Sequence, residues 1–296
     1  MENQSLKNKF KIFFTYDLWK IICLAVAVCF ALVVIYNIVE KKPTEGQRFS
    51  VLYGDDIIVG EEVNDFLNSI TDLEAENSFS YDVLAVESKT VQSNDGTSLS
   101  VMATYADVND DDIFISSNTL MESYVSSHRA EGYTFYLERT FNYLYENGFY
   151  NELGEINEDK IVKSFLEKYA KDSRFKKSEE LEKGKNLEIK RIKTIYENAS
   201  VLKSVMQTNP EIFIDVEVEG ETYYKYALDL GKLKGGKKNL ENTFKRKVIN
   251  QNSGEITYTI EGVYLLIGNN SSVNGDLHYE SLTYIVQLLK TYSNLI

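Results

Sequence analysis

The stretch Phe49-Ser50-Val51-Leu52-Tyr53-Gly54-Asp55-Asp56 decides the fold class of this chain. Its first five residues form a short β-prone run, and the glycine and two aspartates after them are typical of the end of a strand. Residues 61–76 follow with apolar side chains at the three- and four-residue steps of an amphipathic helix. A strand followed at once by a helix favours an α/β fold.

The same alternation continues along the chain. The run Ile113-Phe114-Ile115 predicts a brief buried strand that stops at Ser116-Ser117-Asn118, and Ser117 or Asn118 is placed to cap a helix beginning near Thr119. Further strands are predicted at residues 81–91, 212–216, 223–228 and 256–267, and further helices at residues 133–147, 158–171, 178–207 and 277–295. Residues 49–296 are numerous enough for one large α/β domain or for two lobes with their own cores, and we expect two lobes.

Residues 21–39 form a run without a formally charged side chain. At 1.5 Å per helical residue this run reaches roughly 28 Å, close to the ~30 Å thickness of the hydrocarbon layer of a bilayer. A cleaved signal peptide is normally shorter and ends in small residues, whereas this run ends in bulky ones, and a buried core helix would show a polar face. The run therefore predicts one transmembrane helix of the signal-anchor kind.

The short basic and aromatic segment before that run sets the expected orientation. Residues 1–20 are predicted to be cytoplasmic, residues 40–48 to be a linker, and residues 49–296 to be an extracellular domain of a single-pass protein in the cell membrane. Membrane lipid is then one expected partner. Cys23 and Cys29, the two cysteines, lie inside the apolar run, so the domain after it contains no disulfide or thiol chemistry.

The charge of the chain excludes one class of partner. The net charge is −13, and because residues 1–42 carry +3, the remainder carries −16. So acidic a surface is poorly suited to a phosphate backbone, and we expect no nucleic-acid binding. The 21 tyrosines and 15 phenylalanines are a high aromatic load. Most of them should fill cores, and the surplus favours a ligand groove or a protein interface without choosing between them.

The sequence contains few signs of a catalytic, metal-binding or phosphate-binding motif. His128 and His278 have no ligand spacing around them, and no phosphate-binding loop or nucleophile elbow is found. The acidic run from Asp107 to Asp112 has the wrong residues at the sixth and twelfth positions of a helix-loop-helix calcium site, which favours a solvated turn. The sequence predicts no catalytic residue, no metal site and no cofactor, although catalysis by a pair of carboxylates stays open.

The order of these pieces resembles a known family. The chain resembles extracellular solute-binding proteins of the type 2 periplasmic-binding fold in the order of three parts. These are the run Ser50-Val51-Leu52-Tyr53-Gly54-Asp55, then a helix and a strand, and then the run Asp111-Asp112-Ile113-Phe114-Ile115-Ser116-Ser117. The start Lys11-Ile12-Phe13-Phe14-Thr15-Tyr16-Asp17-Leu18-Trp19-Lys20 is similar to that of uncharacterised single-pass membrane-anchored proteins of Firmicutes, of clostridial type. The resemblance implies a two-lobed α/β domain with a ligand site between the lobes.

Two hypotheses follow for function. The first is a non-enzymatic, solute-binding-like protein that holds a small molecule, a peptide or a protein partner at the carboxyl ends of its strands, where open α/β sheets place their ligands. The predicted site residues are Tyr53, Gly54, Asp55, Ser116, Ser117 and Asn118. The alternative is an accessory subunit that contacts a membrane transporter, such as an ABC transporter, or a cell-envelope complex. A wall-active hydrolase that uses acidic residues is a third and weaker idea.

Overall fold

The computed structural model describes residues 8, 11, 14, 18–39, 48–71, 85–91, 112–127, 130–169, 171–250, 252–268 and 280–296. The chain separates into two compact units, Met1–Pro43 and Thr44–Ile296. The second unit contains every strand of the described residues. The division of residues 49–296 into two lobes with a cleft between them stays a prediction. The fold class is mixed α/β with a mixed sheet, which confirms the α/β part of the prediction.

The helix α2 (Leu18–Val39) covers the run that we predicted to cross a membrane. Within the described ranges, no helix has both the length and the apolar character needed for a membrane span. The predicted transmembrane helix is therefore wrong, and with it the single-pass anchor, the signal anchor and the placement of the two flanks on opposite sides of a membrane. The sequence argument relied on the length of the run, on its lack of formal charge and on the absence of a polar face.

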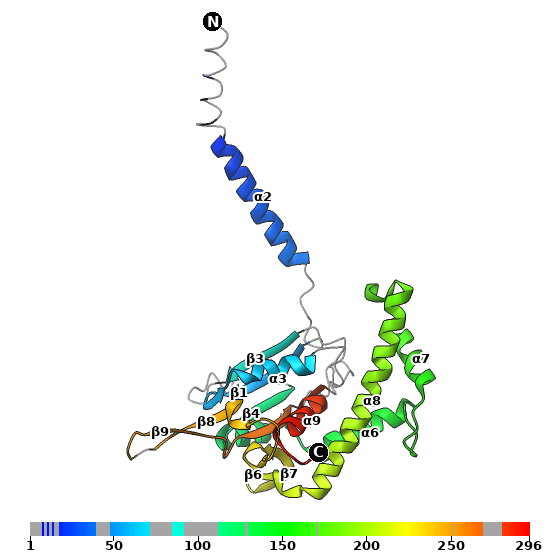
Figure 1. The fold of residues 1–296 in the computed structure, drawn as a ribbon, viewed down its shortest axis with the longest axis vertical. Helices are drawn as coiled ribbons and strands as arrows, with labels where there is room; N and C mark the ends of the chain where they lie inside the picture. Colours follow the sequence, from blue (N-terminus) through cyan, green and yellow to red (C-terminus); the bar gives the residue numbers. More distant parts are fainter. Residues whose placement is uncertain are drawn as a thin grey trace. The chain divides into compact units, whose positions relative to one another are not determined.

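The second unit is built around a seven-stranded sheet. Its strands are β1 (Arg48–Gly54), β3 (Ala85–Val91), β4 (Ile113–Ser116), β5 (Ala130–Glu131), β6 (Phe213–Val218), β7 (Glu221–Asp229) and β10 (Tyr264–Gly268). The order in the sheet is β3-β1-β4-β10-β7-β6, with β5 pairing to β10. β1 runs parallel to both β3 and β4, whereas β10 runs antiparallel to β4 and β7 (Figure 1).

A second, three-stranded sheet has the order β2-β8-β9 and consists of β2 (Ile57–Val59), β8 (Phe244–Ile249) and β9 (Ile256–Thr259). Here the structure differs from the prediction made from the sequence. We predicted one strand over residues 256–267, but Gly262, with φ of +74°, and the turn around it divide this run into β9 and β10. Because the two strands belong to different sheets, this turn links the small sheet to the large one.

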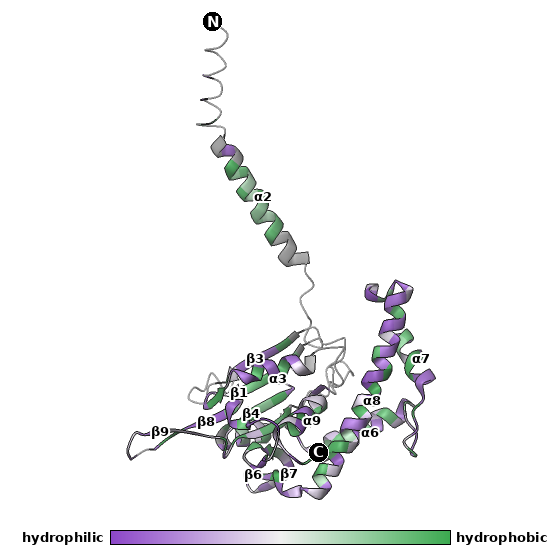
Figure 2. Ribbon diagram, viewed as in Figure 1, coloured by the Kyte–Doolittle hydropathy of each residue, from purple (hydrophilic) through white to green (hydrophobic). Residues whose placement is uncertain are grey.

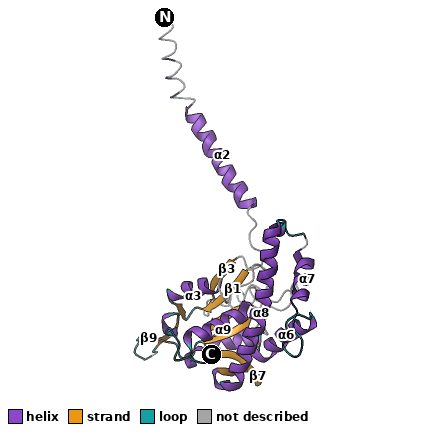
Figure 3. Cartoon of the chain, turned by 45° about the vertical axis from the view of Figure 1, so that its right-hand side comes forward, coloured by secondary structure: helices purple, strands orange, loops and turns teal. Residues whose placement is uncertain are grey.

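The helices of this unit are α3 (Glu62–Thr71), α5 (Asn118–Ser126), α6 (Tyr133–Glu146), α7 (Glu158–Tyr169), α8 (Ser178–Thr208) and α9 (Glu280–Tyr292), shown in Figure 3. Short 3-10 turns occur at η3 (Ser173–Phe175), η4 (Pro210–Ile212), η5 (Leu230–Lys232) and η6 (Leu240–Asn242). The predicted helices at residues 133–147, 158–171 and 178–207 are confirmed, with small differences at their ends. Residues 72–84, 92–111 and 269–279, which contain parts of other predicted elements, lie outside the described residues.

Alternation along the strands explains why both faces of the large sheet are covered. Val51, Tyr53, Ile113 and Ile115 join the main core with α9, whereas Leu52 and Phe114 join a second cluster with α5. Successive side chains of a strand point to opposite faces, so these two clusters lie on opposite sides of the sheet. Figure 2 shows hydrophobic colour on β1 and β4 and mostly hydrophilic colour on the amino-terminal part of α8.

The helices α6, α7 and α8 enclose a third cluster that includes Leu144, Ile161 and Ile192. Gly184 of α8 is buried, and a Cβ atom there would lie 2.6 Å from Phe175 Cε1 and 2.7 Å from Phe165 Cζ. The sequence indicated only that this glycine weakens the helix. In the structure it provides the space that two aromatic rings occupy.

Replacing Gly184 with leucine should therefore loosen the contact between α7 and α8. We expect a loss of about 2 kcal/mol in the free energy of unfolding, because overpacking normally costs about 1–3 kcal/mol and outweighs the gain of about 1 kcal/mol in helix propensity. Urea unfolding followed by circular dichroism measures it. The control is Lys183→Leu at the exposed neighbouring position, and an equal effect of both variants would contradict this role of Gly184.

Candidate functional site

The carboxyl ends of β1 and β4 meet at one edge of the large sheet, as the site prediction requires. The two strands are parallel neighbours, with Leu52 opposite Phe114 and Tyr53 opposite Ile115. The next residues, Gly54 and Ser116, therefore lie side by side, and Ser116 Cβ is 3.3 Å from the point where a Cβ atom on Gly54 would be. The structure brings the two predicted triplets together although about 60 residues separate them in the sequence.

Two of the six predicted residues are core residues. Tyr53 is 1% exposed, and its ring lies 6.0 Å from that of Phe244, measured between centroids. Burial raises the pKa of Tyr53 well above its ordinary value, which keeps the phenol neutral. Ser116 is fully buried, and its Oγ donates a hydrogen bond to the carbonyl oxygen of Ser117. Neither side chain is placed to contact a ligand at the surface.

Of the other four predicted residues, which lie at the edge, Gly54 and Ser117 are also buried, and Asp55 and Asn118 are exposed. Asp55 is exposed in the turn between β1 and β2, and Asn118 is exposed at the first position of α5, where its Nδ2 donates to Glu122 Oε1 at 3.4 Å. Ser117 is the N-cap residue of α5, with extended backbone angles but without a side-chain cap hydrogen bond. The amide groups of the first turn of α5 therefore point toward this edge without a side-chain cap, and the helix dipole adds positive character there.

Asp56 belongs to the same edge, and the sequence reasoning missed it. Asp56 Oδ1, Leu120 Cδ1 and Ser116 Cβ all lie within 3.3 Å of the point where a Cβ atom on Gly54 would be. Gly54 thus allows three chain segments to approach closely. Asp56 Oδ1 is buried and has no hydrogen-bond partner among the described residues. The only sequence signal was the second aspartate of the turn, which a solvated turn explains equally well.

Asp56 Oδ1 shares this state with Glu62 Oε2 and both carboxylate oxygens of Glu131, which are also buried without a hydrogen-bond partner among the described residues. Losing hydration without gaining a hydrogen bond is unfavourable. The main chain of Asp56 is fixed, since its carbonyl oxygen accepts a hydrogen bond from the amide of Lys247 in β8 at 2.9 Å. The edge therefore combines acceptors, the carboxylates of Asp55 and Asp56, with donors, the first amides of α5 and the side chain of Asn118. It matches a ligand that carries both a positive and a negative group.

A second cluster of charged side chains lies in the interior, around Tyr136 of α6. Glu131 of β5 forms an ion pair with Arg139 of α6, with 2.8 Å between Oε2 and Nη2. Asp112 accepts a hydrogen bond from the amide of Ser50 at 2.8 Å, and Glu280 at the start of α9 pairs with Arg191 of α8 at 3.3 Å. Burial raises the pKa of Tyr136 above its ordinary range. These contacts join β5 to α6, α8 to α9, and β1 to Asp112 just before β4, which is a structural role.

The remaining sequence predictions about chemistry have these outcomes. Asp112, at the end of the acidic run, is buried and accepts a hydrogen bond from the backbone of β1. Residues 101–111, His128 and His278 lie outside the described residues. No cluster of three or more metal-ligating side chains occurs within the described ranges. Aromatic pairs gather in the cores, for example Tyr150 and Tyr196, which stack with centroids 4.0 Å apart.

Comparison with known protein families, with curated proteins and with solved structures gives no match for this chain.

Proposed function

We propose that the protein binds a small zwitterionic molecule, such as a free α-amino acid, at the edge formed by β1, β4 and α5, without transforming it. The observation that carries the proposal is the buried Oδ1 atom of Asp56, which has no partner among the described residues. An ammonium group is the donor that best satisfies such an atom, since hydrogen bonds between charged groups are about twice as strong as neutral ones.

The second charged group of the proposed ligand, beside the ammonium group, is a carboxylate. The first turn of α5 presents backbone amides that Ser117 does not cap, and Asn118 adds a side-chain amide. Helix amino termini favour anionic groups through these amides and through the helix dipole. An α-amino acid carries an ammonium and a carboxylate group on one carbon atom, so it offers a donor to Asp56 and an acceptor to the amides of α5.

Binding without catalysis follows from the residues at the edge. The hydroxyl of Ser117 has no hydrogen bond to a histidine or a carboxylate among the described residues, so no activated nucleophile is formed there. The resident groups are hydrogen-bond donors and acceptors on a strand end, a turn and a helix start. These groups hold a ligand and need no general acid or base.

Calorimetric titration of the full chain tests the proposal with three probes: glycine, acetate and methylamine. Glycine carries both charged groups, whereas acetate and methylamine carry one each, so glycine should bind most tightly. Replacing Asp56 with asparagine keeps the shape and removes the charge, and should weaken glycine binding about 10- to 100-fold, since a charged hydrogen bond contributes about 1.5–3 kcal/mol.

The matched control is Asp65→Asn, the same chemical change at an exposed position of α3. It should leave binding unchanged. Larger L-amino acids are titrated next, so that a preference for a side chain does not hide binding. Flat titrations with glycine and with all of these amino acids, or equal affinity of the wild type and Asp56→Asn for the one that binds best, would overturn the proposal.

A further inference from the structure

The hairpin of β8 and β9 forms an outer edge of the protein that the proposed ligand site does not use. β9 is the last strand in the order β2-β8-β9, and β8 is its partner among the described residues. Figure 1 shows this hairpin extending away from the large sheet. An exposed edge strand presents backbone donors and acceptors to any strand that can pair with it.

The hydrogen bonds at the turn show which residues face outward. Asn250 donates its amide to Glu255 at 2.9 Å, and Gly254 donates its amide to Asn250 at 2.8 Å, which closes the hairpin. Bonded and non-bonded pairs alternate in an antiparallel ladder. Ile256 and Tyr258 therefore direct their backbone groups away from β8, toward the outer edge.

One face of the hairpin combines exposed apolar and cationic side chains. The register places Ile249 opposite Ile256 and Lys247 opposite Tyr258, so these four side chains share a face. Ile249, Ile256 and Tyr258 are 55%, 47% and 54% exposed. Lys245 joins the same face, and its Nζ lies 5.5 Å from the centre of the Tyr258 ring. Large apolar groups exposed together are typical of an interaction surface.

The charge of the hairpin is opposite to that of the chain as a whole. Lys245, Arg246 and Lys247 are consecutive, and Glu255 is the only acidic residue from 244 to 259, whereas the chain carries −13. Lys245 and Lys247 share the face of Tyr258, whereas Arg246 lies on the opposite face, where its guanidinium group is beside Gly262. Neither lysine forms an ion pair with an acidic side chain among the described residues. A local cationic surface on an acidic protein attracts acidic partners and suppresses contact with cationic ones.

We propose that β9 binds an extended acidic segment of a partner protein, which adds to the small sheet as its fourth strand. The outward backbone groups of Ile256 and Tyr258 pair with the segment, and their side chains contact its apolar residues. The acidic residues of the segment lie about two strand spacings, ~9.6 Å, from β8, a distance similar to the screening length of ~10 Å at 0.1 M salt. Salt should therefore weaken this contact.

A second copy of this chain fits the hairpin less well. Two copies of this chain each carry a net charge of −13, and this like charge opposes their association. Nucleic acid is disfavoured by the overall charge of −13. The inference does not depend on amino-acid binding, because it uses neither the Asp56 edge nor α5.

The test uses the full chain and a fluorescent peptide of three Glu-Val repeats, which alternates acidic and β-branched residues. Fluorescence anisotropy should show binding, and a peptide of three Lys-Val repeats should bind at least about tenfold more weakly. N-methylation of alternate amides of the acidic peptide should abolish binding if pairing with the β9 backbone is required. Raising the salt concentration from 50 to 500 mM should weaken binding.

Two variants locate the contact. Lys247→Glu reverses a charge beside Tyr258 and should weaken binding at least about tenfold, whereas Lys163→Glu, the same change on the exposed surface of α7, should not. Circular dichroism checks that both variants are folded. Equal binding of the acidic and basic peptides, absence of binding of the acidic peptide, or equal affinity of the Lys247→Glu and wild-type proteins would overturn the proposal. So would a dimer, or binding of single-stranded DNA, that Tyr258→Ala abolishes.

Discussion

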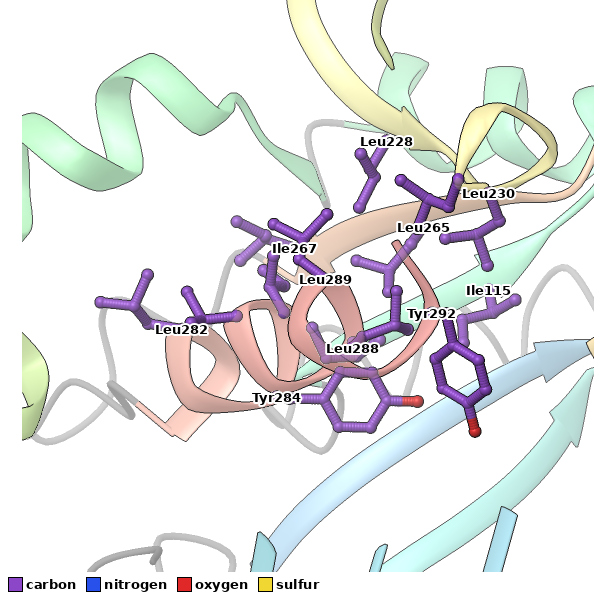
Figure 4. Close-up of a cluster of buried hydrophobic side chains, with 14 of the residues drawn as sticks. Ile115, Leu228, Leu230, Leu265, Ile267, Leu282, Tyr284, Leu288, Leu289 and Tyr292 are labelled. Carbon is purple, nitrogen blue, oxygen red and sulfur yellow. The ribbon is translucent and has the colours of Figure 1, made fainter. Parts of the chain in front are cut away.

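Replacing Leu265 with alanine should lower the free energy of unfolding by about 2–5 kcal/mol, which is the range measured for large-to-small changes in close-packed cores. Leu265 lies in β10, in the middle of the large sheet, and is fully buried. Figure 4 shows it among Leu228, Leu289 and Tyr292, which come from β7 and α9. Removing three carbon atoms there leaves a cavity. Neither the strands nor α9 can move to fill it, because their backbones are fixed by hydrogen bonds.

The control for this prediction is the same substitution at Leu153, which is 84% exposed in the turn before α7. Leu153→Ala should change stability by less than about 0.5 kcal/mol. Urea unfolding of both variants, at one pH and temperature, gives the comparison. A loss below about 1 kcal/mol for Leu265→Ala would show that β10 is not packed between β7 and α9 as described.

Local signals were sufficient to predict the edge of the large sheet. The apolar run that ends at Gly54 and the one that ends at Ser116 were each identified as strands, and the helix after Asn118 was expected. Parallel strands that each precede a turn place their carboxyl ends together, so the shared edge follows from the pattern. The pattern does not show how deeply each side chain is buried. Burial of Tyr53 and Ser116 depends on α9 and α5, which are distant in the sequence.

The hairpin was missed for a related reason. β8 begins Phe244-Lys245-Arg246-Lys247. Because three consecutive residues are cationic, the alternation of apolar and polar residues that indicates a strand is not visible there. β9 and β10 were joined into one predicted strand because the run from Ile256 to Ile267 is rich in apolar and β-branched residues on both sides of Gly262. The separation depends on which sheet each half pairs with, and sequence periodicity contains no information about pairing partners.

The second large effect that we expect is a dependence of stability on pH caused by one carboxyl group, that of Glu131. Burial raises the pKa of Glu131 to about 7, although the nearby Arg139 guanidinium lowers it. The ordinary value, 4.5, applies to the unfolded chain. Between these values the folded protein holds a proton that the unfolded chain has released. Stability from this group is thus complete below pH 4.5 and is lost as the pH rises to about 7.

The size of the effect follows from the shift in pKa. A difference of one unit corresponds to about 1.4 kcal/mol, so the stability contributed by Glu131 should fall by roughly 3 kcal/mol over this interval. The side chain is 3% exposed, so little solvent screening is expected. Tyr136 on α6 and Tyr226 on β7 also interact with Glu131, and Tyr136 interacts in turn with Asp112 and Glu280. Total stability therefore includes their titration as well.

A variant isolates the contribution of Glu131 from the rest. Glu131→Gln keeps the shape and cannot titrate, so its stability relative to the wild type should rise by roughly 3 kcal/mol between pH 4.5 and pH 8. Glu167→Gln, at a side chain that is 70% exposed on α7, should show no such trend. Urea unfolding at four pH values measures both differences. If the Glu131→Gln difference stayed constant with pH, then attraction by Arg139 would balance the burial of the carboxylate, and Glu131 would be ionised throughout as half of a stable ion pair.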